Sequence, residues 1–197
     1  MALAVPQAAL GEPVPAPLAT VTAGATALLD GIATAEDWSA ASATVAGMTA
    51  AWDAYRTGDV PTMLGIAITD ALTALDAAVV ANDGIGTQEA AIEVAQTSLD
   101  LQLRYQAPVD VDTVQFDLWT TRIAADVAAG DGAVVAGDVA TLAWVWDRIA
   151  HTVTPKAASS IDAMLDDFRI AADGGDLGAA DVILADLRGL LAGAARW

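Results

Sequence analysis

The chain has 197 residues, enough for one large domain or two small ones with a buried core. Hydrophobic residues make up 55% of it, and 26 acidic residues against eight basic ones give a formal net charge of −18. This charge excludes nucleic acid as a partner, because the chain cannot release the counterions of phosphate groups. The absence of cysteine excludes disulfides and thiolate metal sites.

The N-terminal segment is rich in proline. Pro6, Pro13, Pro15 and Pro17 predict a flexible tail over residues 1–15. The segment lacks the basic start and long apolar run of a signal peptide, and no stretch of the chain has the unbroken apolar character of a transmembrane segment. Tails of this kind often follow a removed signal or lipid anchor. We therefore expect an exported or secreted protein outside the cytoplasm, while a cytoplasmic location stays open.

Turn signals divide the rest of the chain at intervals of roughly 24 residues, which suits helices about 30 Å long. Four of these signals, TGDV, ANDG, AGDG and GGDL, place an aspartate after a small or polar residue, and a fifth places Thr154 before Pro155 as a helix cap. Apolar residues enter and leave the turns at helical spacing. The pattern predicts eight helices, at 16–31, 35–57, 60–82, 87–106, 112–129, 133–152, 155–173 and 177–195.

Short connections make sequential helices antiparallel neighbours. We therefore predict an all-α fold, an antiparallel up-and-down bundle of about eight helices. Residues 16–197 would form a single domain, and a boundary between two sub-bundles would lie near 107–111. The alternative is a short α-solenoid of helical hairpins, whose period falls in the range of HEAT-type repeats although their sequence signatures are absent.

The helix predicted at 133–152 has an apolar stripe that we expect to lie in the core. Its members are Val135, Val139, Leu142, Trp146, Ile149 and Val153. The stretches MTAAWDAY (48–55) and FDLWTTRI (116–123) have the same spacing and the same expected burial. Core positions are also expected for three methionines, Met48, Met63 and Met164.

A second face of the same helix carries Trp144, Arg148 and His151, the only histidine of the chain. Arg148 lies one turn after Trp144, within reach of a cation–π contact, and Asp147 lies one turn before His151. An aromatic plane, a cation and a titratable ring on one stripe indicate a site for a small organic ligand or a protein partner. The alternatives are that the face packs against another helix, or that Arg148 shields an exposed indole.

Metal sites have weaker support. The chain has no Glu-x-x-His motif of the ferritin-like kind, although Glu89 and Glu93 could face Asp147 and His151 across a two-helix gap. The stretch DVDTVQFD departs from the EF-hand loop at Val114, so we expect Asp110 or Asp112 to be a helix cap instead. No cofactor is expected.

Motifs for catalysis are absent. The chain has no nucleophile elbow, phosphate-binding loop or dinucleotide fingerprint, and a single histidine leaves few partners for a nucleophile. We expect a non-enzymatic binding or interaction protein that presents the Trp144, Arg148, His151 and Asp147 face to a small ligand or protein partner. A divalent-cation-binding or metal-handling helical protein outside the cytoplasm is the alternative. An enzyme, a structural spacer and a homo-oligomer stay open.

Overall fold

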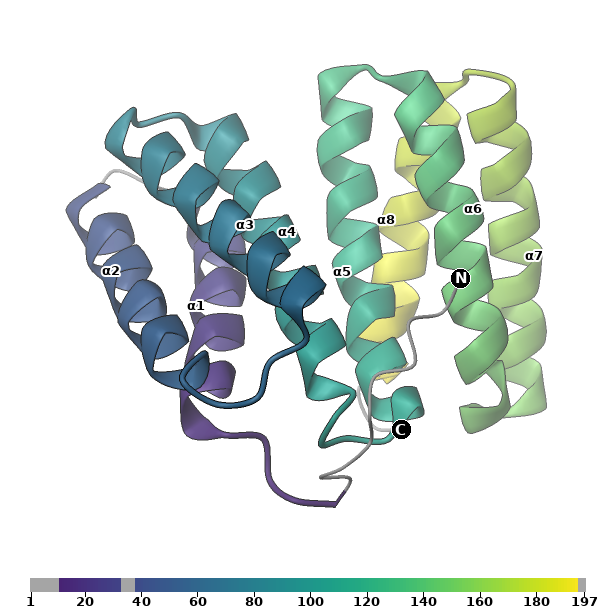
Figure 1. The fold of residues 1–197 in the computed structure, drawn as a ribbon. Coiled ribbons are helices and arrows are strands. Elements are labelled where there is room, and N and C mark those ends of the chain that lie inside the picture. The colour runs from purple at the N-terminus through teal and green to yellow at the C-terminus, as the bar shows by residue number, and fades with distance from the viewer. Residues whose placement is uncertain (1–10, 33–37, 195–197) are drawn as a thin grey trace. The chain divides into compact units, whose positions relative to one another are not determined.

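The computed structural model describes residues 11–32 and 38–194, and the regular elements within them are helical. The elements are α1 (Ala16–Ile32), α2 (Trp38–Tyr55), α3 (Thr62–Val80), α4 (Gly84–Gln102), α5 (Pro108–Ala129), α6 (Gly132–Ile149), the 3₁₀ helix η1 (Ala150–Thr152), α7 (Pro155–Asp173) and α8 (Leu177–Ala194) (Figure 1). The prediction of an all-α helical bundle is confirmed. The chain divides into two compact units, residues 1–111 (unit one) and 112–197 (unit two).

Unit one is a closed bundle of the first four helices. α1 packs on α2, α2 on α3 and α3 on α4, and α4 returns to pack on α1 (Figure 1). The contact between α1 and α4 closes the ring of four neighbouring helices, as in a four-helix bundle. The side chains of Leu18, Val45, Met48, Trp52, Ile68, Leu75 and Leu99 lie in its core.

Unit two contains the last four helices, with α7 packed on both α6 and α8. Side-chain bonds tie α5 to its neighbours. Arg122 of α5 pairs with Asp138 of α6 at 3.0 Å, and Arg188 of α8 donates to the hydroxyl of Thr121 of α5 at 3.1 Å. The core includes Phe116, Ile123, Leu142, Phe168, Leu184 and Leu187.

Three of the predicted aspartate turns share one backbone geometry. A residue with positive φ ends one helix, and the aspartate after it caps the next; the pairs are Asn82–Asp83, Gly130–Asp131 and Gly175–Asp176. In the first turn, the Asp83 N–H donates to the Ala78 carbonyl at 2.9 Å, and the Asp83 carboxylate accepts from the Gly86 N–H at 3.0 Å. Each of these short turns thus provides hydrogen-bond partners for free backbone groups at the end of one helix and at the start of the next.

The fourth aspartate turn differs. α3 follows Pro61, without a side-chain cap, and Asp59 instead accepts hydrogen bonds from Arg104, in the turn that follows α4. Thr154 caps α7 as predicted, with Pro155 in the first helical position. Other predicted boundaries shift by a few residues, because Asp83 starts α4 early and Pro108 starts α5 early. The predicted tail lies largely outside the described residues, as does the predicted start of the second helix.

Among the described residues, α3 is the one helix long and apolar enough to cross a membrane by length and composition. Its apolar window has a mean hydropathy of 1.7, but core helices of soluble proteins meet the same test, so the finding is weak evidence for a span. Only 22% of that window is buried. The helix therefore exposes much of its apolar surface.

Candidate functional site

The two tryptophans of α6 lie on different faces. The Trp146 side chain is 3% exposed, contacts the Phe116 ring and donates its indole N–H to Asp162 at 2.7 Å. The Trp144 side chain is 62% exposed. The predicted stripe is buried from Val135 to Ile149, as expected, and only its last member, Val153, is half-buried.

Arg148 joins Trp144 to α5. Its guanidinium lies 3.9 Å from the centre of the Trp144 ring, and its Nε and Nη2 donate to the two carboxylate oxygens of Asp112 at 2.8 and 2.6 Å. Asp112 is 6% exposed. The expected cap role is wrong, because α5 begins at Pro108 and both Asp110 and Asp112 lie inside it.

The other two predicted members of this face lie in solvent. Asp147 is exposed at the end of α6, and His151 is exposed in η1, because α6 ends at Ile149. The structure thus brings Trp144 and Arg148 together and adds Asp112, while the side chains of Asp147 and His151 have no hydrogen bond within the described residues. The prediction placed His151 in the same helix as Asp147, whereas the structure places it in the 3₁₀ helix that follows α6.

No group of three or more histidine, aspartate or glutamate side chains in the described part of the chain is placed to hold a metal ion. Glu89 and Glu93 belong to α4 of unit one, and Asp147 and His151 belong to unit two.

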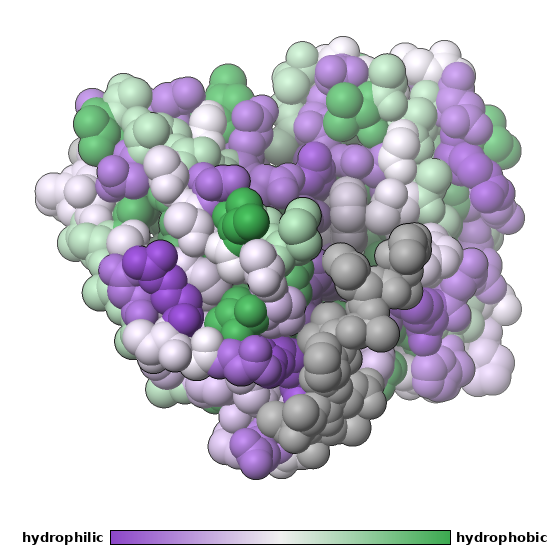
Figure 2. Space-filling model, viewed as in Figure 1, coloured by the Kyte–Doolittle hydropathy of each residue, from purple (hydrophilic) through white to green (hydrophobic). Residues whose placement is uncertain are grey.

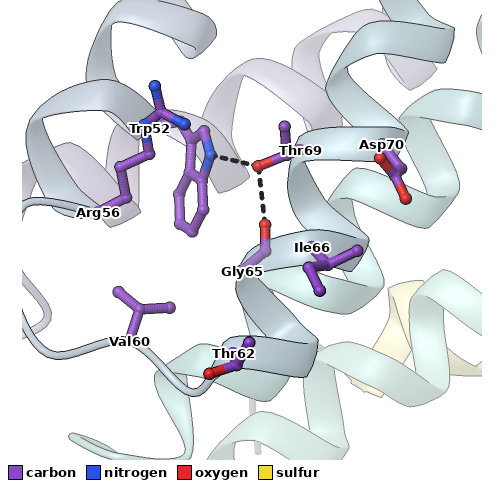
Figure 3. Close-up of a pocket in the computed structure, with 8 residues that line it drawn as sticks. All are labelled: Trp52, Arg56, Val60, Thr62, Gly65, Ile66, Thr69 and Asp70. Atoms are coloured by element: carbon purple, nitrogen blue, oxygen red, sulfur yellow. Dashed lines mark hydrogen bonds between the residues drawn. The ribbon is translucent and has the colours of Figure 1, made fainter.

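A hollow of about 370 Å³ lies in unit one between the end of α2 and the start of α3. We call it the α2–α3 cleft. Its lining residues are Trp52, Arg56, Val60, Thr62, Gly65, Ile66, Thr69 and Asp70 (Figure 3). The volume falls within the range of cavities that hold a small ligand or a large side chain.

The floor of the α2–α3 cleft is apolar. The Trp52 indole points from α2 toward α3, and its N–H donates to the Thr69 hydroxyl at 3.0 Å (Figure 3). That hydroxyl donates to the Gly65 carbonyl at 2.7 Å. Because these polar groups already have partners, the floor offers mainly ring and methyl surface to an occupant.

Large apolar side chains stand on the surface beside the cleft. Met63 is 65% exposed and Ile66 is 51% exposed; three residues apart on one helix, they are surface neighbours. We call this pair the α3 rim. Figure 2 shows hydrophobic side chains among hydrophilic ones on the surface over α3. The expectation that Met63 lies in the core is wrong, because the buried stripe of α3 runs through Ile68 and Leu72 and leaves position 63 outside.

One pair of carboxylates in unit two is electrostatically unusual. Burial, together with a hydrogen bond to Asp138 and its charge, raises the pKa of Asp126 to about 6, although Arg122 opposes the rise. Asp138 is bound by Arg122. Above about pH 6, ionised Asp126 therefore adds a negative charge beside the ion pair between Arg122 of α5 and Asp138 of α6.

Sequence reasoning identified Trp52 as a core residue but missed the α2–α3 cleft. Two signals were present. Met63 and Ile66 fall off the buried stripe of α3, and Gly65 leaves the surface between α2 and α3 without a side chain. The depth of the cleft depends on how far α2 and α3 stand apart, which the periodicity of either helix does not specify.

The chain was compared with family models, with curated proteins and with solved structures, and none of them matches it.

Proposed function

We propose that the chain is a non-enzymatic interaction protein whose α2–α3 cleft receives an apolar side chain of a partner protein. The observation that carries the proposal is the α3 rim beside the cleft. Ile66 lines a hollow with an apolar floor, and Met63 lies three residues before it on the same helix; both side chains are more than half exposed. Contiguous exposed apolar surface next to a concavity is typical of protein-binding sites.

The chemistry of the lining also supports binding. Trp52 and Thr69 use their hydrogen-bonding groups within the protein, and Arg56 pairs with Asp53 at 2.8 Å. The lining contains neither histidine nor a nucleophile beside a base, which proton transfer or covalent catalysis would use. The contact would therefore draw its affinity from apolar burial.

Site-specific photocrosslinking in the natural host tests the proposal. A photoreactive phenylalanine replaces Met63, and a matched chain carries it at Ile170 of α7, an equally apolar and exposed position in unit two. We expect a defined crosslinked partner at position 63 only. Gly65→Leu should abolish this crosslink by filling the cleft; its Cβ meets only Val60, at an ordinary 3.6 Å. The same crosslinks at both positions, or none at 63, would refute the proposal.

A second candidate site, on unit two, rests on the exposed Trp144 indole with a guanidinium stacked on one side. We propose that its other side, with Asp147 and His151 nearby in the chain, takes a planar ligand. Chemical shifts of the Trp144 indole N–H during a titration with aromatic carboxylates test this site. His151→Ala should weaken the response if this side chain contacts the ligand. An indole N–H chemical shift that does not change in the unmodified chain would eliminate the candidate.

A further inference from the structure

We infer that the partner segment bound at the α2–α3 cleft is cationic, a helix or strand that carries lysine or arginine beside its apolar anchor. The inference rests on the proposed function and adds the chemistry of the partner. It follows from the charges of unit one, from the pairing of its two arginines and from the carboxylate within the cleft.

Unit one is the more acidic part of the chain. It contains half of the 26 acidic residues but only two of the eight basic ones, Arg56 and Arg104. Both arginines are paired: Arg56 with Asp53 at 2.8 Å, and Arg104 with Asp59 at 3.4 Å. The unit therefore has no unpaired arginine or lysine to attract an anionic partner, whereas its field attracts a cationic one.

The cleft itself repeats this asymmetry. Asp70 lines it and is exposed, and its carboxylate has no hydrogen bond or ion pair within the described residues. It lies four residues after Ile66, so the carboxylate and the α3 rim share one face of the helix. An apolar side chain in the cleft would thus place the next turn of a partner segment near a free carboxylate. A lysine or arginine there gains an ion pair.

A membrane surface is the other occupant that apolar side chains could suit. The net charge of −18 repels the anionic lipids that hold most peripheral proteins. The cleft is also concave, and a concavity suits a discrete side chain better than a lipid surface. The observations therefore favour a cationic protein segment.

The test uses three synthetic helical peptides of about 18 residues, equal in length and in their leucine face. Their polar faces carry lysine, glutamine or glutamate. Each is titrated into the full chain, and the Trp52 indole N–H is followed by NMR after assignment with Trp52→Phe. At low salt we expect the lysine peptide to shift this signal with an affinity at least about tenfold above that of the glutamine peptide. The difference should shrink in 1 M salt, where screening reaches about 3 Å.

Two variants on α3 locate the contact. Asp70→Asn should lower the affinity for the lysine peptide about threefold, in line with the loss of one exposed ion pair. The affinity for the glutamine peptide should not change. Asp76→Asn removes the same charge from an exposed position outside the cleft and should have less effect. Equal losses from both variants would mean unspecific attraction to an acidic protein, and would overturn the inference.

The other outcomes separate the inference from the proposed function. Equal affinities for the lysine and glutamine peptides would overturn the cationic partner but retain binding at the cleft. A Trp52 shift with neutral phosphatidylcholine vesicles, and none with peptides, would replace the partner with a lipid surface. Failure of all three peptides would overturn the inference, while the crosslink at position 63 would still decide the proposed function.

Discussion

Trp144 and Trp146 are two residues apart and differ in burial, so substituting each of them tests how burial of a side chain determines its contribution to the free energy of unfolding. Trp146→Ala should lower the free energy of unfolding by about 3–5 kcal/mol, because a cavity replaces a packed indole and Asp162 loses its hydrogen bond. Trp144→Ala should cost less than about 1 kcal/mol. Urea unfolding of both variants measures the difference. Equal large losses would contradict the two-face description of α6.

Arg148 is predicted to stabilise unit two through Asp112. Arg148→Met leaves a carboxylate that is 6% exposed without its partner, which should cost about 2–4 kcal/mol. The double variant Arg148→Met with Asp112→Asn should recover most of that loss, because no buried charge remains. A double-mutant cycle in urea measures the coupling energy. A coupling near zero would show that the cation is available to a ligand instead.

The candidate site was only partly predictable at this scale. The exposure of Trp144 and its contact with Arg148 follow from spacing within one helix, which a sequence shows directly. The bond from Arg148 to Asp112 joins residues 36 positions apart. Its formation depends on how α5 and α6 align, and many other aspartates of this acidic chain were equally plausible partners.

At the scale of helices, most of the fold was predictable because its signals are local. An αL residue followed by an aspartate ends one helix and starts the next within two positions, so the turns near Asp83, Asp131 and Asp176 could be identified from sequence. The exception near Asp59 depends on Arg104, which lies 45 positions away. Closure of unit one between α1 and α4 likewise leaves no mark in either helix.

Substitution by alanine should lower stability at one glycine of α1 and raise it at one glycine of α2. A Cβ at Gly24 would overlap the buried Met48 side chain, so Gly24→Ala should cost about 1–2 kcal/mol by forcing α1 from α2. Gly47→Ala meets no atom within 4 Å and should gain about 0.5–1 kcal/mol from helix propensity. Thermal unfolding of the pair provides the measurement. A gain at Gly24 would show that α1 and α2 are less closely packed than described.

The contact between α5 and α6 should weaken as pH rises. The folded pKa of Asp126, about 6, lies above its ordinary value of 3.8. Between these values the unfolded chain loses this proton before the folded chain does, so the contribution of Asp126 to stability falls as pH rises and stays low above pH 6. Asp126→Asn should therefore stabilise the protein at pH 7.5 by about 1–2 kcal/mol, allowing for solvent screening, and by little at pH 4.

Urea unfolding of wild type and Asp126→Asn at the two pH values measures the effect of this carboxylate pair, because carboxylates other than the partner Asp138 contribute equally to both proteins. Asp181→Asn, at an exposed position of α8, is the matched control and should show no such dependence. A benefit of Asp126→Asn that is equal at pH 4 and pH 7.5 would assign it to packing instead.

For the whole molecule, the net charge of −18 lowers the stability of the folded state, because the acidic side chains repel one another. Self-repulsion of a compact acidic chain is screened over about 10 Å at 0.1 M salt and about 3 Å at 1 M. We therefore expect the midpoint of thermal unfolding to rise by about 3–6 °C from 20 mM to 0.5 M NaCl, which corresponds to about 1–2 kcal/mol for a chain of this size. An uncharged solute at equal osmolality should give a smaller rise.

Calcium chloride at matched ionic strength separates screening from binding. If screening is the whole effect, CaCl₂ and NaCl should raise the midpoint by similar amounts, without saturation. A larger rise that saturates with calcium would follow the logarithmic law of a ligand bound only by the folded state. The acidic surface would then hold divalent cations, and the metal-handling function would displace the interaction protein proposed above. Equal curves would leave the −18 charge as a field that attracts cationic partners.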